Sequence, residues 1–172
     1  MFDFTQYMRL VCEQNKMARD YEFKHTTCSG INYLEGMLEQ YQTTANFICS
    51  TDVCAESTFL ASGGWFKRRA FMVFILRRYE YGNAEDYALK LKTCRELFRQ
   101  ITSRFIKDSE KLASALIYLR AEDIRSNELG GSFLNGCTGL YFQISLDEPT
   151  DLTYNSGEWL PTFDSTFDAT FF

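Results

Sequence analysis

An unbroken apolar run, Ala70–Leu76 (AFMVFIL), constrains the fold of this 172-residue chain more than any other feature. Neighbouring side chains of a strand point to opposite faces, so the run predicts a strand covered on both sides. The predicted strand spans 65–81, and its ends are basic. A chain with few helices would leave one face of such a strand for another subunit to cover.

A long amphipathic helix is predicted directly after this strand, over residues 83–106. Asn83 is a suitable N-cap residue, and Asp86 follows where a carboxylate stabilises the positive end of a helix. Apolar residues recur at intervals of three and four and form one continuous stripe: Tyr87, Leu91, Cys94, Phe98, Ile101 and Phe105. Such a stripe predicts a helix that packs against a sheet.

Spacing and turn residues predict the shorter elements. They are a helix over 3–20, a loop over 25–30, a short helix over 31–41, a strand over 45–53, a turn at 62–64, and two strands over 116–124 and 139–146 that pair as a hairpin. The fold class is therefore predicted as α+β. An antiparallel sheet carries the long strand, the long amphipathic helix packs on it, and N-terminal helices and an extended C-terminal arm complete the chain.

The composition changes near residue 149, which predicts a domain over 1–148 and an extension over 149–172. Both prolines of the chain lie in the extension, and no lysine or arginine follows Ser145. Its end reads TFDSTFDATFF. One interpretation is a frayed terminus. The other is an arm that docks on a neighbouring subunit through its aromatic side chains: Trp159, Phe163, Phe167, Phe171 and Phe172.

The charge distribution argues against a dedicated nucleic-acid-binding protein. The chain has 18 basic and 23 acidic residues, and its body is nearly neutral once the acidic extension is set aside. A basic strip at the ends of the long strand could still contact a phosphate backbone or an acidic partner; it comprises Lys67, Arg68, Arg69, Arg77 and Arg78. The alternative is ordinary solvated strand ends.

Other function classes have little support in the sequence. An aromatic content of 16% argues against a disordered chain, and no apolar stretch approaches the length of a membrane span. The start of the chain lacks the pattern of an export signal, so the six cysteines are expected to be free thiols.

Candidate chemical sites depend on His25, the only histidine. A zinc site of His25, Cys28, Cys49 and Cys54 matches no common ligand spacing, and a Cys–His enzyme lacks an identifiable third group. The acidic pairs 122–123 and 147–148 are expected to be solvated. We therefore predict no catalytic residue, no metal and no cofactor.

The order of these elements is similar to a family of phage proteins. An N-terminal helix and a strand precede GGWFKRRAFMVFILRRYEYGNAEDYALKLKTCRELFRQI, and a hairpin ends in LGGSFLNGCTGLYFQISL. Over residues 3–147 this resembles the tail terminator and tail-completion proteins of the neck and tail of tailed bacteriophages.

The resemblance implies a structural protein without a cofactor or reaction. It implies a homo-oligomeric ring, commonly a hexamer, that ends the tail tube or joins the tail to the head connector while DNA passes through its lumen. Such a protein is made in the cytoplasm of the bacterial host and resides in the virion, in contact with other neck and tail proteins and with no membrane. A cytoplasmic protein-interaction adaptor of bacterial origin is the alternative.

Overall fold

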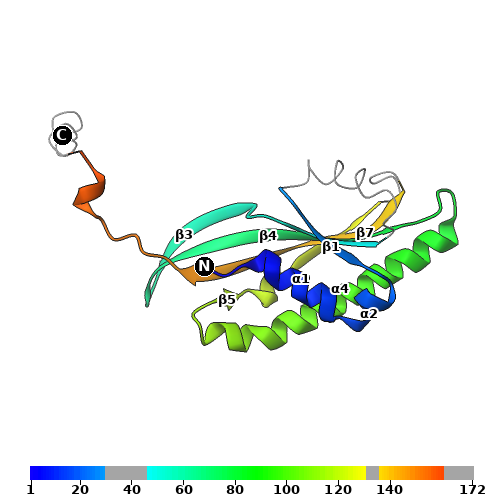
Figure 1. Ribbon diagram of the computed structural model, residues 1–172, viewed down its shortest axis with the longest axis horizontal. Coiled ribbons are helices and arrows are strands. Elements are labelled where there is room, and N and C mark those ends of the chain that lie inside the picture. Colours follow the sequence, from blue (N-terminus) through cyan, green and yellow to red (C-terminus); the bar gives the residue numbers. More distant parts are fainter. Residues whose placement is uncertain (30–45, 131–135, 161–172) are drawn as a thin grey trace.

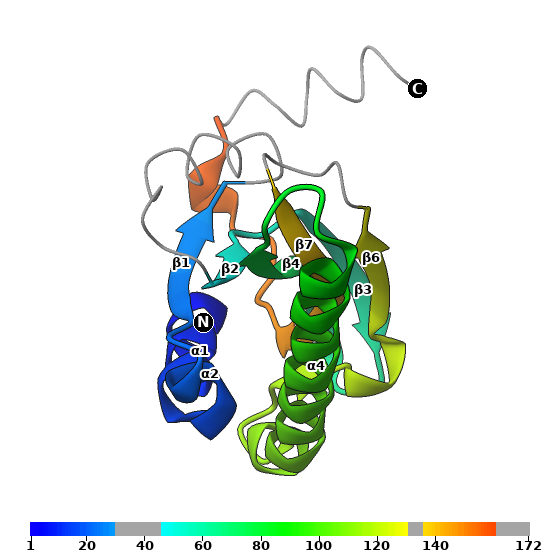
Figure 2. The same cartoon turned by 90° about the vertical axis from the view of Figure 1, so that its right-hand side faces the viewer.

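The computed structural model describes residues 1–29, 46–130 and 136–160. These residues form one seven-stranded sheet with the α-helices packed on one of its faces (Figure 1). The view turned by 90° shows the same two layers, with the long helix α4 lying along the sheet beside the shorter α1 and α2 (Figure 2). The predicted α+β class is confirmed.

The sheet is built around its two longest strands, which pair with each other over thirteen residues of each. The strands are β1 (Lys24–Cys28), β2 (Asn46–Thr51), β3 (Ala55–Ala61), β4 (Gly64–Arg78), β5 (Tyr118–Leu119), β6 (Arg125–Leu129) and β7 (Cys137–Pro149). The central order is β1-β2-β4-β7-β5, with β3 on β4 and β6 on β7. All pairs are antiparallel except β1 with β2, which is parallel.

Two strands share one edge of β4. Strand β2 pairs with its second half, where Ser50 lies opposite Val73, and β3 pairs with its first half, where Ala55 lies opposite Ala70. The hairpin of β3 and β4 therefore extends the sheet at the end where β7 finishes.

The helices begin at polar capping residues. In α1 (Phe4–Gln14), Asp3 accepts a hydrogen bond from the Gln6 N–H, and in α2 (Lys16–Asp20), Asn15 accepts one from Ala18. The extended conformation of Asn15 separates the two helices, so the single helix predicted over 3–20 is wrong at this point. The long helix α4 (Ala84–Ala113) begins at Asn83 as predicted and continues seven residues beyond the predicted end at 106.

The main core fills the space between the sheet and the helices. Met8 of α1, Leu97 and Phe105 of α4, and Val73 and Phe142 of the central strands are fully buried there. The apolar stripe predicted for α4 supplies much of this contact.

The opposite face of the central strands is buried too. Phe47, Cys49, Phe74, Leu76 and Cys137 form a second apolar cluster, and none of them is more than 1% exposed. Both faces of the strand predicted from the run AFMVFIL are therefore covered within one chain. The expectation that a neighbouring subunit must cover one of them is wrong.

Several shorter elements differ from the predictions. Residues 25–28 belong to strand β1 rather than to a loop, and β3 was not predicted at all. The predicted strand over 116–124 is only the short β5 followed by a 3-10 turn, η1 (Ala121–Asp123), and the longer partner of β7 is β6. The predicted helix over 31–41 lies outside the described residues.

Candidate functional site

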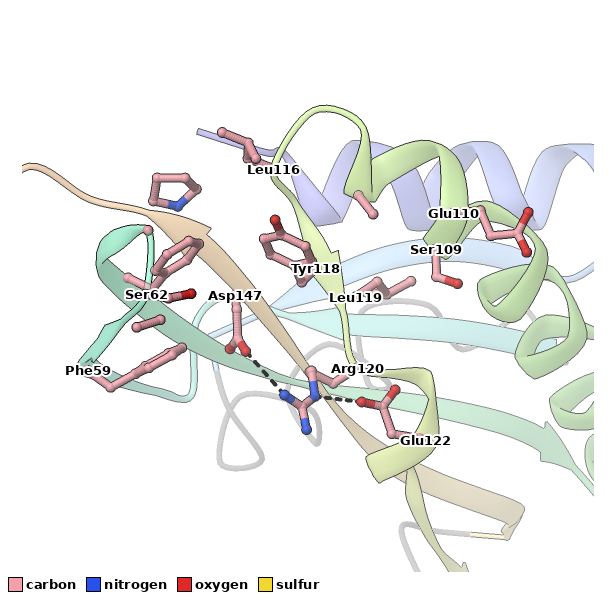
Figure 3. Close-up of a pocket in the computed structure, with 15 residues that line it drawn as sticks. Phe59, Ser62, Ser109, Glu110, Leu116, Tyr118, Leu119, Arg120, Glu122 and Asp147 are labelled. Atoms are coloured by element: carbon pink, nitrogen blue, oxygen red, sulfur yellow. Dashed lines mark ion pairs between the residues drawn. The ribbon is translucent and has the colours of Figure 1, made fainter.

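A cavity of about 730 Å³ lies where the tip of the β3–β4 hairpin, strand β5, the last turn of α4 and the end of β7 meet (Figure 3). Phe59, Phe66 and Tyr118 give it an apolar wall, with ring centroids 5.9 Å apart from Phe59 to Phe66 and from Phe66 to Tyr118. This end of the sheet lies beside the root of the C-terminal arm, because Pro149 also lines the cavity.

Ion pairs centred on Asp147 and Arg120 fix the shape of this cavity. Arg68 holds the two carboxylate oxygens of Asp147 through its Nε and Nη2, at 2.7 and 2.8 Å. On the other side, Arg120 approaches Asp147 at 3.6 Å and pairs with Glu122 at 2.7 Å (Figure 3). A bidentate pair of this kind orients both side chains.

The charges that line the cavity do not suit an anion. Among the described lining residues Arg120 is the only basic one, whereas Glu110, Glu122 and Asp147 are acidic. His25 is not among the lining residues, so the serines of the cavity, Ser62 and Ser109, have no imidazole base. The described lining therefore combines an apolar aromatic wall with ion-paired side chains at one end.

The basic strip predicted at the ends of the long strand is divided between the two faces of β4. Lys67 and Arg69 pair with Glu148, at 3.3 and 3.1 Å, whereas Arg68 pairs with Asp147 on the other face. The side chains of Lys67 and Arg69 are only 16% and 6% exposed. A role for the strip in contacting DNA or a partner stays a prediction.

The two arginines at the other end of β4 are held by contacts within the chain. Arg77 is buried, donates to Asn46 Oδ1 and Thr93 Oγ1, and lies over the ring of Tyr21. The guanidinium of Arg78 lies 5.9 Å from the centre of the Phe47 ring. Both side chains therefore contribute to packing on the sheet.

Asp147 and Glu148 are buried, so the expectation that this acidic pair is solvated is wrong. Antiparallel pairing places them opposite Arg68 and Lys67, which compensates both charges. Burial by itself would raise the pKa of Glu148. The hydrogen bond from the Phe2 N–H and the charges of Arg69 and Lys67 outweigh burial and hold this pKa below its usual value.

The described part of the predicted arm leaves the body of the protein after Thr150, whose N–H donates to Trp65 O. All residues from 151 to 160 are exposed, and Figure 1 shows this segment turning away from the side of the sheet that carries the helices. Four of its apolar side chains are at least about half exposed: Leu152, Tyr154, Trp159 and Leu160. The rings of Trp159 and Tyr154 stack with their centroids 6.4 Å apart. The other predicted arm residues lie outside the described residues: Phe163, Phe167, Phe171 and Phe172.

The four proposed zinc ligands do not converge. Cys28 and Cys49 lie side by side with their sulfurs 3.2 Å apart, but His25 Nε2 bonds to Ser50 Oγ at 2.9 Å, and Cys54 contacts Thr51. No group of three or more metal-ligating side chains occurs in the described parts of the chain. The hydrogen bond with Cys28, together with burial, raises the pKa of the Cys49 thiol, which opposes thiolate chemistry there.

We expect His25 to make the stability of the fold depend on pH. Burial and, to a smaller extent, the charge of Arg9 lower its pKa from about 6.5 to about 4. Between these values the unfolded chain takes up a proton that the folded chain does not, so the free energy of unfolding should fall as the pH falls from 6.5 to 4. His25 is partly exposed, so we expect a loss of about 1–2 kcal/mol.

Chemical denaturation at several pH values measures this effect. His25→Gln serves as the control, because glutamine can bond to Ser50 but does not titrate. The variant should lose less stability than the wild type over this interval. Equal losses of stability in the variant and the wild type would contradict the assignment of this pH dependence to His25.

None of the helices in the described residues is both long and apolar enough to cross a membrane. Neither a scan of protein-family models nor a search of curated proteins finds a match to this chain.

The cavity residues Phe59, Phe66, Tyr118 and Arg120 were not singled out from the sequence. Strand β3 was not predicted, and the meeting of β3, β5 and the end of β7 follows only from the register of the sheet. A signal for the ion pairs was present, however. A basic cluster starts one long strand and an acidic pair ends another, which is the arrangement that antiparallel pairing brings into register.

Proposed function

We propose that this protein is a structural component of a tailed bacteriophage and forms a homo-oligomeric ring in the neck or tail. The ring ends the tail tube or joins the tail to the head connector, and DNA passes through its lumen. The α+β order of elements agrees with what the resemblance to tail terminator and tail-completion proteins implies. A fold alone does not define a function, so the proposal depends on the surfaces of the molecule.

The described part of the arm carries the proposal. An extended segment that exposes Leu152, Tyr154, Trp159 and Leu160 is unfavourable in water unless another surface covers these side chains. The tip of the β3–β4 hairpin, beside the root of the arm, also exposes Leu60 and Trp65, which are 67% and 46% exposed. An arm that docks on a different surface of the next copy forms a head-to-tail interface. Repeating this interface closes a ring when the rotation between neighbouring subunits is a whole fraction of a full turn.

Removing the end of the arm should separate assembly from folding. Deletion of residues 160–172 takes away most of its aromatic side chains, and the described segment next to it, residues 151–159, is exposed throughout. We expect the shortened chain to keep the free energy of unfolding within about 0.5 kcal/mol and to lose self-association. Light scattering after size-exclusion chromatography measures the mass, and denaturation measures the stability.

A matched variant tests the same point at constant length. Replacing Phe163, Phe167 and Phe171 with serine keeps the aspartates of the arm and should also abolish assembly. If the protein is instead an adaptor whose arm only binds a different protein, both variants should keep the oligomeric state of the full chain. That outcome would contradict assembly of the ring through the arm.

A further inference from the structure

A groove between α1 and α4 has the properties of a docking site. It encloses about 590 Å³, within the usual size range of binding pockets. Its apolar lining includes Leu10 and Val11 of α1 and Ile101 of α4. Leu10 is 41% exposed, so part of its side chain is accessible to a partner in the groove.

Hydrogen bonds between the two helices hold the walls of this groove. Tyr7 donates to Asp108 Oδ2 at 2.9 Å, and Asn15 donates to Gln100 Oε1 at 2.9 Å. The two bonds join α4 to the start of α1 and to the junction of α1 with α2, about two turns of α4 apart, so the groove exists before any partner binds. A preformed site avoids the entropic cost of ordering its walls when it is occupied.

The rim of the groove is basic. Among the described residues, its charged lining side chains are Lys16, Arg104 and Lys107, and none of them is acidic. Asp108 pairs with Arg104 at 2.6 Å, but neither Lys16 nor Lys107 has an ion-pair partner among the described residues. An acidic segment with apolar side chains would complement both the rim and the interior.

The end of this chain has that composition. Residues 161–172 hold four phenylalanines, two aspartates and no base, and Phe163 and Phe167 each precede an aspartate. The cavity at the hairpin tip suits this segment less well, because acidic residues outnumber the single base there. Charge complementarity therefore favours the groove between α1 and α4.

We propose that this groove binds the C-terminal segment of a second copy of the chain, with phenylalanines in the groove and Asp164 and Asp168 at the lysines of its rim. The described arm leaves on the side of the sheet opposite the helices (Figures 1 and 2), so it is directed away from the groove of its own chain. This inference rests on the proposed ring and specifies the surface that joins its subunits.

Substitutions that reverse the charges of the groove and of the arm, made in the full chain, test the proposal. The groove variant is Lys16→Glu with Lys107→Glu, and the arm variant is Asp164→Lys with Asp168→Lys. Each should weaken self-association about tenfold or more, measured by sedimentation over a range of concentrations, because attraction becomes repulsion. Combining all four substitutions restores both the attraction and the original net charge, and should recover most of the association.

A matched control uses two exposed lysines away from the groove, Lys24→Glu with Lys92→Glu. This control should not weaken association by itself, and it should not rescue the arm variant. Rescue by the control, or no rescue by the groove variant, would overturn the proposal.

Photo-crosslinking identifies the occupant directly. A photoreactive phenylalanine analogue replaces Phe167 in chains labelled with heavy nitrogen, which are mixed with unlabelled wild-type chains before irradiation. We expect heavy-to-light crosslinks to residues 7–16 and 100–107. Crosslinks within one chain only, or to another surface, would overturn the proposal.

These results are distinguishable from failure of the proposed function. If the full chain assembles and the groove variants assemble equally well, the ring is still supported, but docking of the arm in this groove is contradicted. A full chain that stays monomeric and gives no heavy-to-light crosslink contradicts both.

Discussion

Replacing Gly139 with alanine should destabilise the protein more than any other single substitution considered. Gly139 lies in β7 between Leu76 of β4 and Leu129 of β6, with a φ of +150°. A Cβ atom at this position would lie 2.0 Å from the Ile75 carbonyl oxygen. Backbone on a central strand cannot move aside easily, so we expect a loss of at least about 3 kcal/mol in the free energy of unfolding.

Gly130→Ala is the matched control for this substitution. A Cβ atom at Gly130 meets no other atom within 4 Å, and its φ lies outside the range that disfavours alanine. We expect a change within about 0.5 kcal/mol, measured by chemical denaturation. If both variants were equally stable, the close pairing of β4 and β7 at Gly139 would be wrong.

Removing the carboxylate of Glu148 should have the second largest effect. This side chain is 6% exposed and compensates Arg69, which is equally buried, and Lys67. It also accepts a hydrogen bond from the Phe2 N–H, while Arg69 donates to Phe2 O. Glu148→Ala therefore leaves a buried guanidinium without its partner, and we expect a loss of about 3 kcal/mol.

Glu128→Ala provides the comparison, because it breaks the pair of Arg95 and Glu128 on the surface. That pair has good bidentate geometry, at 2.6 and 2.8 Å, but both side chains are about half exposed. Solvent screens it, so the stability should change very little.

A double variant separates burial from pairing at Glu148. Arg69→Met with Glu148→Met should lose less stability than the sum of the two single changes, because the buried guanidinium of Arg69 is no longer left without its partner. Additive losses would contradict the direct pairing of these residues.

The parts of the fold that the sequence predicted are those with long, uniform patterns. The apolar run in β4 and the stripe from Tyr87 to Phe105 in α4 extend over many residues. A single residue that departs from the pattern therefore does not obscure the spacing of the apolar side chains. The alternation in β7 was equally clear. These elements define the two layers, which is why the fold class could be predicted.

Short and exposed elements could not be predicted in the same way. Strand β1 reads KHTTC, and β3 is exposed along almost its whole length, so neither carries the alternation of a half-buried strand. Their conformations depend on pairing with β2 and β4, which is a tertiary effect.

The candidate surfaces depend on register and helix packing rather than on local pattern. The basic strip was visible in the sequence, but the pairing of Lys67 and Arg69 with Glu148 follows only from the register of β4 and β7. In the same way, the groove requires the packing of α1 on α4, which brings Leu10 and Lys107 to one site.

The proposed ring requires assembly of identical copies, and the mass and symmetry of the full-length protein in solution test this requirement most directly. Native mass spectrometry and particle imaging of the purified chain should give a closed ring with cyclic symmetry, for which we propose six copies of the 20.0 kDa chain. A uniform monomer of 20.0 kDa at high concentration would contradict it.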